Sequence, residues 1–200
     1  FGQYISTYAK GRHVPDVLFR LGECYMNQSK LPEAERYWSE VVNRYPKAEA
    51  APSAAYRLAA SNYNAGDFKA AATYFNFCEQ KTQLPRVRLA AAFYKSQAYQ
   101  MLKDTKKERE ALKTVLAVSK DNDFREKALV SMATLLQREG NNSEAQPILN
   151  EIIASTKDPA VRADAALKAA VLYSDKKDSQ EAIRLYDIVL KSDSSSPEAK

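Results

Sequence analysis

The stretch YNAGDFKAAATYF, residues 63–75, decides the fold of this chain. A Gly-Asp pair stands in its middle, and small and aromatic residues follow at spacings of three and four. Glycine suits the left-handed position that ends a helix, and aspartate suits the N-cap that begins the next one. The stretch therefore predicts two helices joined by a tight turn, and packing alone explains its small and aromatic residues.

The same pattern recurs along the chain with a constant step of 37 residues. A column of small residues on the first helix of each copy holds Gly22, Ala59, Ser96, Ala133 and Ala170. A column of large residues on the second helix holds Trp38, Phe75, Leu112, Leu149 and Tyr186. Two helices pack closely where a bulky ridge meets a groove, so the two columns predict helix pairs that stack into a continuous core.

We therefore expect an all-α fold, a right-handed α-solenoid of about five helix-turn-helix repeats. The expected repeats cover residues 15–51, 52–88, 89–125, 126–162 and 163–199. The step extended backwards makes residues 1–9 the end of the second helix of a truncated copy. We expect residues 1–200 to form a single solenoid domain, excised from a longer chain with neighbouring repeats or domains outside it.

The first copy closely resembles the tetratricopeptide repeat (TPR) pattern. The residues that carry the resemblance are Leu18, Leu21, Gly22, Tyr25, Ala34, Trp38 and Pro46. The resemblance covers essentially the whole chain and is poorest in the third copy. There Glu108 replaces a small residue and Lys95 replaces a leucine, which bears on the packing of that copy. The step of 37 is longer than the family's usual 34, so we expect longer helices or linkers.

The resemblance implies that the first helix of each pair lines a concave groove, where an extended peptide or a helix of a protein partner docks. Carried over residue by residue, it gives the candidate site residues Phe19, Arg20, Glu23, Met26, Tyr56, Arg57, Tyr63, Phe93, Gln97 and Gln100. Exposed aromatic residues in these rows would anchor a partner. The alternative is that they pack between adjacent helices, and both interpretations stay open. The family's clamp for a terminal carboxylate is not expected, because Phe19, Tyr56 and Phe93 stand where its lysine would be.

The net charge of +5 is unevenly distributed along the chain. Residues 81–120 hold ten Lys or Arg and three acidic residues, whereas the remainder holds 20 basic and 22 acidic residues. This basic band is an alternative binding surface for nucleic acid, an anionic surface or an acidic protein. Five of its ten cations lie on a turn and a second helix: Lys103, Lys106, Lys107, Arg109 and Lys113. A solvated helix face is the interpretation that we favour, and nucleic-acid binding is the weaker one.

The sequence offers little for catalysis or metal binding. The single histidine, His13, lies in a linker without converging partners, and the five glycines form no phosphate-binding loop. Cys24 and Cys78 form no C-x-x-C pattern, so we expect two buried thiols rather than a zinc site or a disulfide framework. No apolar run reaches the ~18 residues of a membrane-spanning helix. We expect a non-enzyme without cofactor or metal; an accessory arm of a larger enzyme is the alternative.

Two local features concern the fourth and fifth copies. Asn141 and Asp178, each with a Glu three residues on, resemble capping boxes. Pro147 lies beyond the first turn of an expected second helix, where an interior proline costs about 3 kcal/mol. We therefore expect a kink or a late helix start there.

The linker Tyr45–Ala54, YPKAEAAPSA, resembles the Y-P-x-x-x-x-A-P-x-A linker common in bacterial cell-envelope repeat proteins. These include periplasmic Tol-Pal-associated proteins and outer-membrane assembly lipoproteins. The resemblance implies a periplasmic or envelope location and a role in assembling envelope complexes. A cytoplasmic adaptor is the alternative.

Overall fold

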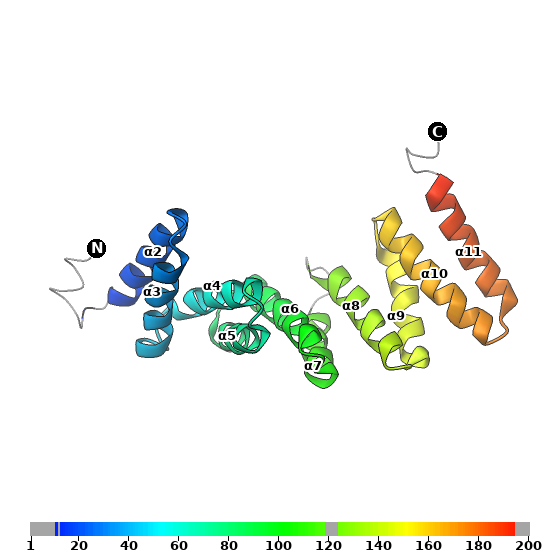
Figure 1. The fold of residues 1–200 in the computed structure, drawn as a ribbon. Helices are drawn as coiled ribbons and strands as arrows, with labels where there is room; N and C mark the ends of the chain where they lie inside the picture. The colour runs from blue at the N-terminus through cyan, green and yellow to red at the C-terminus, as the bar shows by residue number, and fades with distance from the viewer. Residues whose placement is uncertain (1–10, 12, 119–123, 195–200) are drawn as a thin grey trace. The chain divides into compact units, whose positions relative to one another are not determined.

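The structure is a computed structural model that describes residues 11, 13–118 and 124–194 of the chain. Its regular elements in these ranges are all helices (Figure 1). They are α2 (Val14–Asn27), α3 (Leu31–Arg44), α4 (Ala51–Asn64), α5 (Phe68–Lys81), α6 (Pro85–Met101), α7 (Thr105–Ala117), α8 (Arg125–Arg138), α9 (Asn142–Ser155), α10 (Pro159–Asp175) and α11 (Ser179–Ser194). The predicted all-α helical-repeat fold is confirmed. The helix end predicted at residues 1–9 lies outside the described residues.

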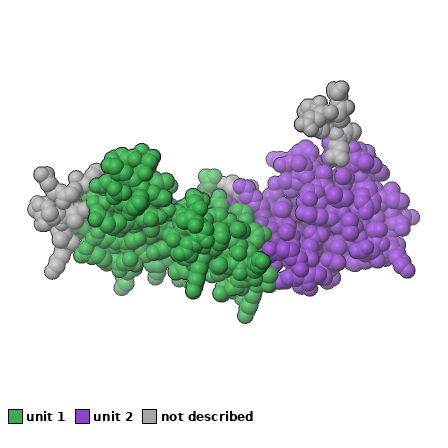
Figure 2. All heavy atoms as spheres, viewed as in Figure 1, with its two compact units in different colours: residues 1–115 green, residues 116–200 purple. Residues whose placement is uncertain are grey.

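The chain divides into two compact units, residues 1–115 and 116–200 (Figure 2). In the first unit α2 packs against α3, α3 against α4, α4 against α5, and α5 against α6. In the second unit α8, α9, α10 and α11 likewise pack in chain order. Contact between neighbours in sequence is what a stack of helix pairs requires. That all 200 residues form one domain stays a prediction.

One residue in each copy has a left-handed backbone, with φ between 57° and 82°, and these residues recur at the 37-residue step. They are Ser29, Gly66, Lys103, Gly140 and Lys177. In the second copy the amide of Gly66 donates to the carbonyl of Tyr63 at 3.1 Å, and the amide of Asp67 donates to that of Asn62 at 2.9 Å. This pair of bonds is the Schellman motif, and all five copies make it. The motif sets the turn even where the residue is not glycine.

Replacing the left-handed lysine of the third copy should stabilise the chain. An L side chain in this conformation costs roughly 1–2 kcal/mol, so Lys103→Gly should raise the free energy of unfolding by up to about 1 kcal/mol. Urea denaturation measures the change. Lys113→Gly, at an exposed site inside α7, is the matched control and should lower stability by about 1 kcal/mol. Equal losses in both variants would contradict the role assigned to Lys103.

Side chains that follow the turns cap the second helices. Asp67, Asp104 and Asp178 each accept a hydrogen bond from the backbone amide three residues on, at 2.9, 3.2 and 3.3 Å. The capping box predicted at Asn141 is wrong, because its side chain makes no cap hydrogen bond to α9. Of the two outcomes predicted from Pro147, the late start is wrong, because α9 begins at Asn142 and contains the proline, and the kink stays a prediction.

The helices α6 and α10 are longer than the other first helices, 17 residues against 14. Each follows a buried threonine, Thr82 or Thr156, whose hydroxyl accepts a hydrogen bond from the amide two residues on. Arg88 and Arg162, from the second turns of these helices, donate to the carbonyls of the same threonines. A guanidinium at a helix C-terminus satisfies a carbonyl that the helix leaves free. These longer helices follow short linkers, residues 82–84 and 156–158, whereas the 14-residue α4 follows the longer linker 45–50. The additional residues of the repeat step therefore lie in the first helix in some copies and in the linker in others.

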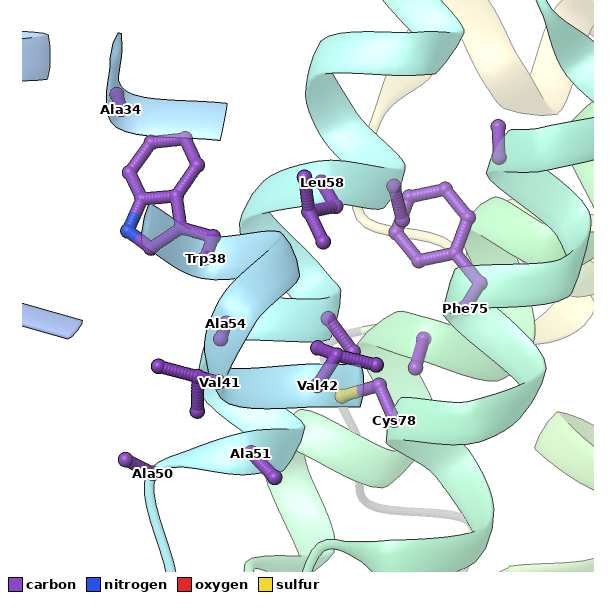
Figure 3. Close-up of a cluster of buried hydrophobic side chains, with 14 of the residues drawn as sticks. Ala34, Trp38, Val41, Val42, Ala50, Ala51, Ala54, Leu58, Phe75 and Cys78 are labelled. Carbon is purple, nitrogen blue, oxygen red and sulfur yellow. The ribbon is translucent and has the colours of Figure 1, made fainter. Parts of the chain in front are cut away.

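The predicted contact between small and large columns is clearest in the first copy. A Cβ atom on Gly22 of α2 would lie 2.3 Å from Nε1 and 2.5 Å from Cδ1 of Trp38 in α3. The indole therefore lies directly against the backbone of α2. Trp38 is 1% exposed, and in the core that it joins, Leu58 of α4 and Phe75 of α5 are also buried (Figure 3).

The same contact does not hold in the fifth copy. Tyr186, which stands in the large column, is exposed, and the neighbouring Leu185 is fully buried instead. The prediction that Tyr186 acts as a ridge is therefore wrong.

A methyl group at position 22 should be poorly tolerated. Gly22→Ala would favour the helix by about 1 kcal/mol through propensity alone, but the clash with Trp38 should reverse this and cost about 2–3 kcal/mol. Thermal or urea unfolding gives the value. In a Trp38→Leu background the same substitution should cost at least about 1 kcal/mol less, because the clashing ring is gone. Equal costs in both backgrounds would contradict the contact.

The third copy packs with buried polar side chains in place of the family's apolar ones. Lys95 of α6 donates a hydrogen bond to Asn76 of α5 at 3.1 Å. It also forms an ion pair with Glu79, another residue of α5. The side chains of Lys95 and Glu79 are only 12% and 14% exposed. Glu108 is buried within α7, whose Leu112 is fully buried too. The departures from the family pattern thus mark polar contacts in a formed repeat.

Restoring the family's leucine at position 95 should destabilise this protein. Lys95→Leu removes the cation and leaves the Glu79 carboxylate in a poorly solvated place, at a cost of about 2 kcal/mol. The double variant Lys95→Leu/Glu79→Leu should recover most of the loss, because a packed apolar pair often matches a buried ion pair. Chemical denaturation of both variants checks this. A single variant as stable as the parent would show that the ion pair contributes nothing.

Candidate functional site

All the candidate residues lie on first helices of the first unit. Helix α2 holds Phe19, Arg20, Glu23 and Met26; helix α4 holds Tyr56, Arg57 and Tyr63; helix α6 holds Phe93, Gln97 and Gln100. The structure gathers four of them around one pocket.

This pocket, which we call the aromatic pocket, lies among α4, α5 and α6 and has a volume of about 370 Å³. Its lining residues are Tyr56, Ala60, Tyr63, Asn64, Phe75, Phe93, Tyr94 and Gln97. Five are aromatic, and none carries a formal charge at neutral pH. Such a lining is suited to an apolar ligand group held with a few hydrogen bonds.

Three rings of the pocket contact one another. Tyr56 meets Phe75 edge to face at 5.5 Å between centroids, and it meets Tyr94 in the same way at 6.4 Å. Phe75 and Tyr94 are stacked at 5.9 Å with 23° between their planes. Aromatic pairs in such geometries are favourable by about 0.5–1.5 kcal/mol beyond their buried area. The cluster therefore holds this wall of the pocket in place before any ligand arrives.

The rings of the pocket differ in exposure. Phe93 is only 8% exposed, so the expectation of an exposed side chain is wrong for this residue, which packs between helices. Tyr56 and Tyr63 are half-buried, and Tyr63 lies edge to face with Phe68 at 5.2 Å. Tyr94 is 37% exposed. The two interpretations left open by the sequence thus apply together: the same rings pack between helices and line a surface pocket.

Sequence reasoning missed Tyr94 and Phe75 as pocket residues. Tyr94 stands one step of 37 after Arg57 and two steps after Arg20. The sequence did hold a signal for Tyr94: it is an aromatic residue at a repeat position where the first two copies have arginine. Phe75 was assigned to the core; it is buried there and also lines the pocket.

A cation lies beside the neutral pocket. Arg57 donates through Nη2 to Oε2 of Glu23 at 2.7 Å, which links α4 to α2. Burial, followed by the neighbouring Tyr94, raises the pKa of Tyr56, and the positive charge of Arg57 acts in the opposite direction. Arg57 therefore lies close enough to Tyr56 to influence its hydroxyl.

The other candidate residues do not line the aromatic pocket. The guanidinium carbon of Arg20 lies 5.9 Å from the ring centroid of Phe19, a half-buried side chain of α2. Met26 is 47% exposed, and Gln100 of α6 is half-buried. Their part in a docking surface stays a prediction.

Several cations of the basic band have partners within the chain. Lys107 forms an ion pair with Asp104 at 2.8 Å and lies 5.4 Å from the ring centroid of Tyr99. Hydrogen bonds from Lys107 lower the pKa of the Asp104 carboxyl. Lys103, Lys106 and Lys113 are exposed. These observations agree with a solvated helix face.

Neither a metal centre nor a membrane span appears in the described part of the chain. No group of three or more Cys, His, Asp or Glu side chains there could hold a metal ion. None of its helices has the length and apolarity needed to cross a bilayer. Cys78 is fully buried, whereas Cys24 is exposed, so the expectation of two buried thiols is wrong for Cys24.

The two thiols should differ sharply in reactivity. Burial raises the pKa of the Cys78 thiol to about 12, from an ordinary value near 9. At pH 8 a thiol-specific reagent should therefore modify Cys24 at once and Cys78 only after unfolding. Because the unfolded state ionises Cys78 more readily, this group should also reduce stability as pH rises from about 9 towards 12. Rapid labelling of native Cys24→Ser would contradict the burial of Cys78.

Comparison with models of known protein families supports the tetratricopeptide repeat pattern. Family models described as tetratricopeptide repeat match residues 16–48 and 130–197, together about half of the chain. The chain is a member of the tetratricopeptide repeat family. Proteins of this family typically serve as non-catalytic scaffolds for protein interactions. No curated protein sequence gives a significant match.

Solved structures of similar fold come from several TPR proteins. YrrB, described as a TPR protein with an unusual peptide-binding site, has a TM-score of 0.69 at 16% identity, over 94% of this chain and 91% of its own. MamA from Desulfovibrio magneticus RS-1 has a TM-score of 0.66 at 15% identity, over 92% and 97%. A TPR protein from Parabacteroides merdae has a TM-score of 0.60 at 17% identity, over 94% and 69%. At such identities the likeness concerns the fold alone.

Proposed function

We propose that this chain is a non-catalytic scaffold that binds a segment of a protein partner on the first helices of its N-terminal unit. The observation that carries the proposal is the aromatic pocket. Its residues come from three consecutive helices, and Tyr56, Tyr63, Phe93 and Gln97 are among those that the family resemblance assigns to the docking groove.

The chemistry of the pocket supports a peptide ligand. A volume of about 370 Å³ is sufficient for one large side chain, and the ring cluster forms its wall in advance. Preformed walls reduce the entropy lost on binding. The amides of Asn64 and Gln97 add donors and acceptors of the kind that a peptide backbone needs. YrrB, a protein of similar fold, is described as having a peptide-binding site, which makes such a ligand a reasonable analogy.

The proposal is tested by affinity capture from the source organism, at low and at high salt. Tyr56→Ala/Tyr94→Ala should lose a specific protein that the parent chain retains at high salt, because truncating two anchor rings removes most of a hot spot. Phe93 is unsuitable for this test, since truncating a buried phenylalanine costs about 3–5 kcal/mol of stability.

Tyr186→Ala is the matched control for this experiment, because Tyr186 and Tyr94 are both 37% exposed. It should capture the same protein as the parent chain. Bound nucleic acid that salt releases, and that the double variant still binds, would instead support the basic band, since phosphate contacts release counterions. A partner enzyme whose activity depends on the bound chain would support the role of an accessory arm.

From the linker Tyr45–Ala54 we further propose that the partner belongs to a bacterial envelope complex. Fractionation of the source organism should then place the full protein in the periplasm or with the envelope. Recovery in the cytoplasm would refute this part of the proposal and favour a cytoplasmic adaptor. The proposal of a binding scaffold does not depend on the result.

A further inference from the structure

We infer that the aromatic pocket selects an acidic partner segment that inserts one aromatic side chain between α4 and α6. The inference rests on the proposed function, and it specifies the chemistry of the ligand at that site. Two separate observations carry it: the composition of the pocket walls and the charge of the helices that form them.

The walls favour an aromatic side chain. Tyr56, Phe75 and Tyr94 already contact one another edge to face or stacked, at centroid distances of 5.5–6.4 Å. A further ring can extend such a cluster through the same geometries. A charged side chain would have to leave water for a lining without charges, which is unfavourable. The lining also holds tyrosine hydroxyls and two side-chain amides, groups of the kind that hydrogen-bond an indole N–H or a phenol.

The surrounding charge favours acidic residues next to that ring. Helices α4, α5 and α6, with the turn between α4 and α5, together hold six Lys or Arg and two acidic residues, Glu79 and the exposed Asp67. Glu79 is already paired with Lys95. A basic peptide would be repelled by this surface, whereas an acidic one is attracted and oriented before it docks.

Arg57 is the cation best placed to meet a carboxylate of the ligand. It follows Tyr56 in the sequence, and its side chain is 49% exposed although it is paired with Glu23. A guanidinium has five N–H donors, so a second carboxylate can share it. Glu23 competes for the same cation, and its Oε1 is buried without a hydrogen-bond partner among the described residues. Removing the Glu23 charge should therefore strengthen the binding of an acidic ligand.

The test uses the 200-residue chain and four labelled peptides of equal length in a Gly/Ser background. Their central residues are Glu-Trp-Glu, Gln-Trp-Gln, Lys-Trp-Lys and Glu-Ala-Glu, and fluorescence anisotropy at about 0.15 M salt gives the affinities. The Glu-Trp-Glu peptide should bind at least about tenfold more tightly than each of the other three, a difference of about 1.4 kcal/mol.

Variants locate the binding. Tyr94→Ala should weaken Glu-Trp-Glu binding about tenfold, and Tyr186→Ala, the control of equal exposure, should leave it unchanged. Glu23→Gln should tighten it several-fold without altering the affinity for Gln-Trp-Gln. Circular dichroism melts establish that each variant is folded.

Each other outcome overturns the inference in a recognisable way. Equal binding of the acidic and basic tryptophan peptides would remove the charge preference and leave the proposed scaffold intact. If the Glu-Ala-Glu peptide binds the parent chain and Tyr94→Ala with equal affinity, the acidic ligand binds the basic band and not the aromatic pocket. Binding of none of the peptides would refute the inference, and the scaffold itself would fail only if affinity capture also showed no dependence on Tyr56 and Tyr94.

Discussion

The close approach of two helices at a small residue is the constraint on which the rest of this structure depends. At Gly22 the indole of Trp38 lies so near the backbone of α2 that a single methyl group would overlap it. In the next copy the small position is Ala59 and the large position is Phe75, and both side chains are buried. Each close contact lets one helix pair bury its apolar side chains, and the next pair then packs against a surface already formed.

The packing that forms the core also positions the residues of the candidate site. Phe75 is a core residue of the second helix pair, yet its ring also meets Tyr56 and Tyr94 at the surface. The pocket wall is therefore continuous with the hydrophobic core and shares its rigidity. A surface held in this way can present aromatic groups to a ligand without first having to order them. In this protein the residues that stabilise the fold and those that would bind a partner overlap.

The same helices carry two kinds of charged residue: side chains paired within the chain and cations exposed at the surface. Lys95 of the third copy is paired with Glu79 of the second copy, where the family has an apolar residue at the lysine position, and Lys107 pairs with Asp104 at the start of α7. These local pairs account for part of the basic band. Exposed cations lie along α4, α5 and α6, and among them Arg57 stands beside a pocket that is itself uncharged. An uncharged aromatic pocket with Arg57 beside it is the combination from which we infer selectivity for an acidic, aromatic ligand.

The sequence by itself determined the helix pairs, their 37-residue step, the aspartate caps and the positions of the turns, because these depend on local spacing and backbone preference. It also placed Tyr56, Tyr63, Phe93 and Gln97 on the correct helices. Only the tertiary structure decided that Phe93 is buried, that Cys24 and Tyr186 are exposed, and that Tyr94 joins Tyr56 and Phe75 around one pocket. The physical reason is that a side chain's exposure, and its neighbours across helices, depend on how the next pair packs, which a repeating column of residue types does not specify.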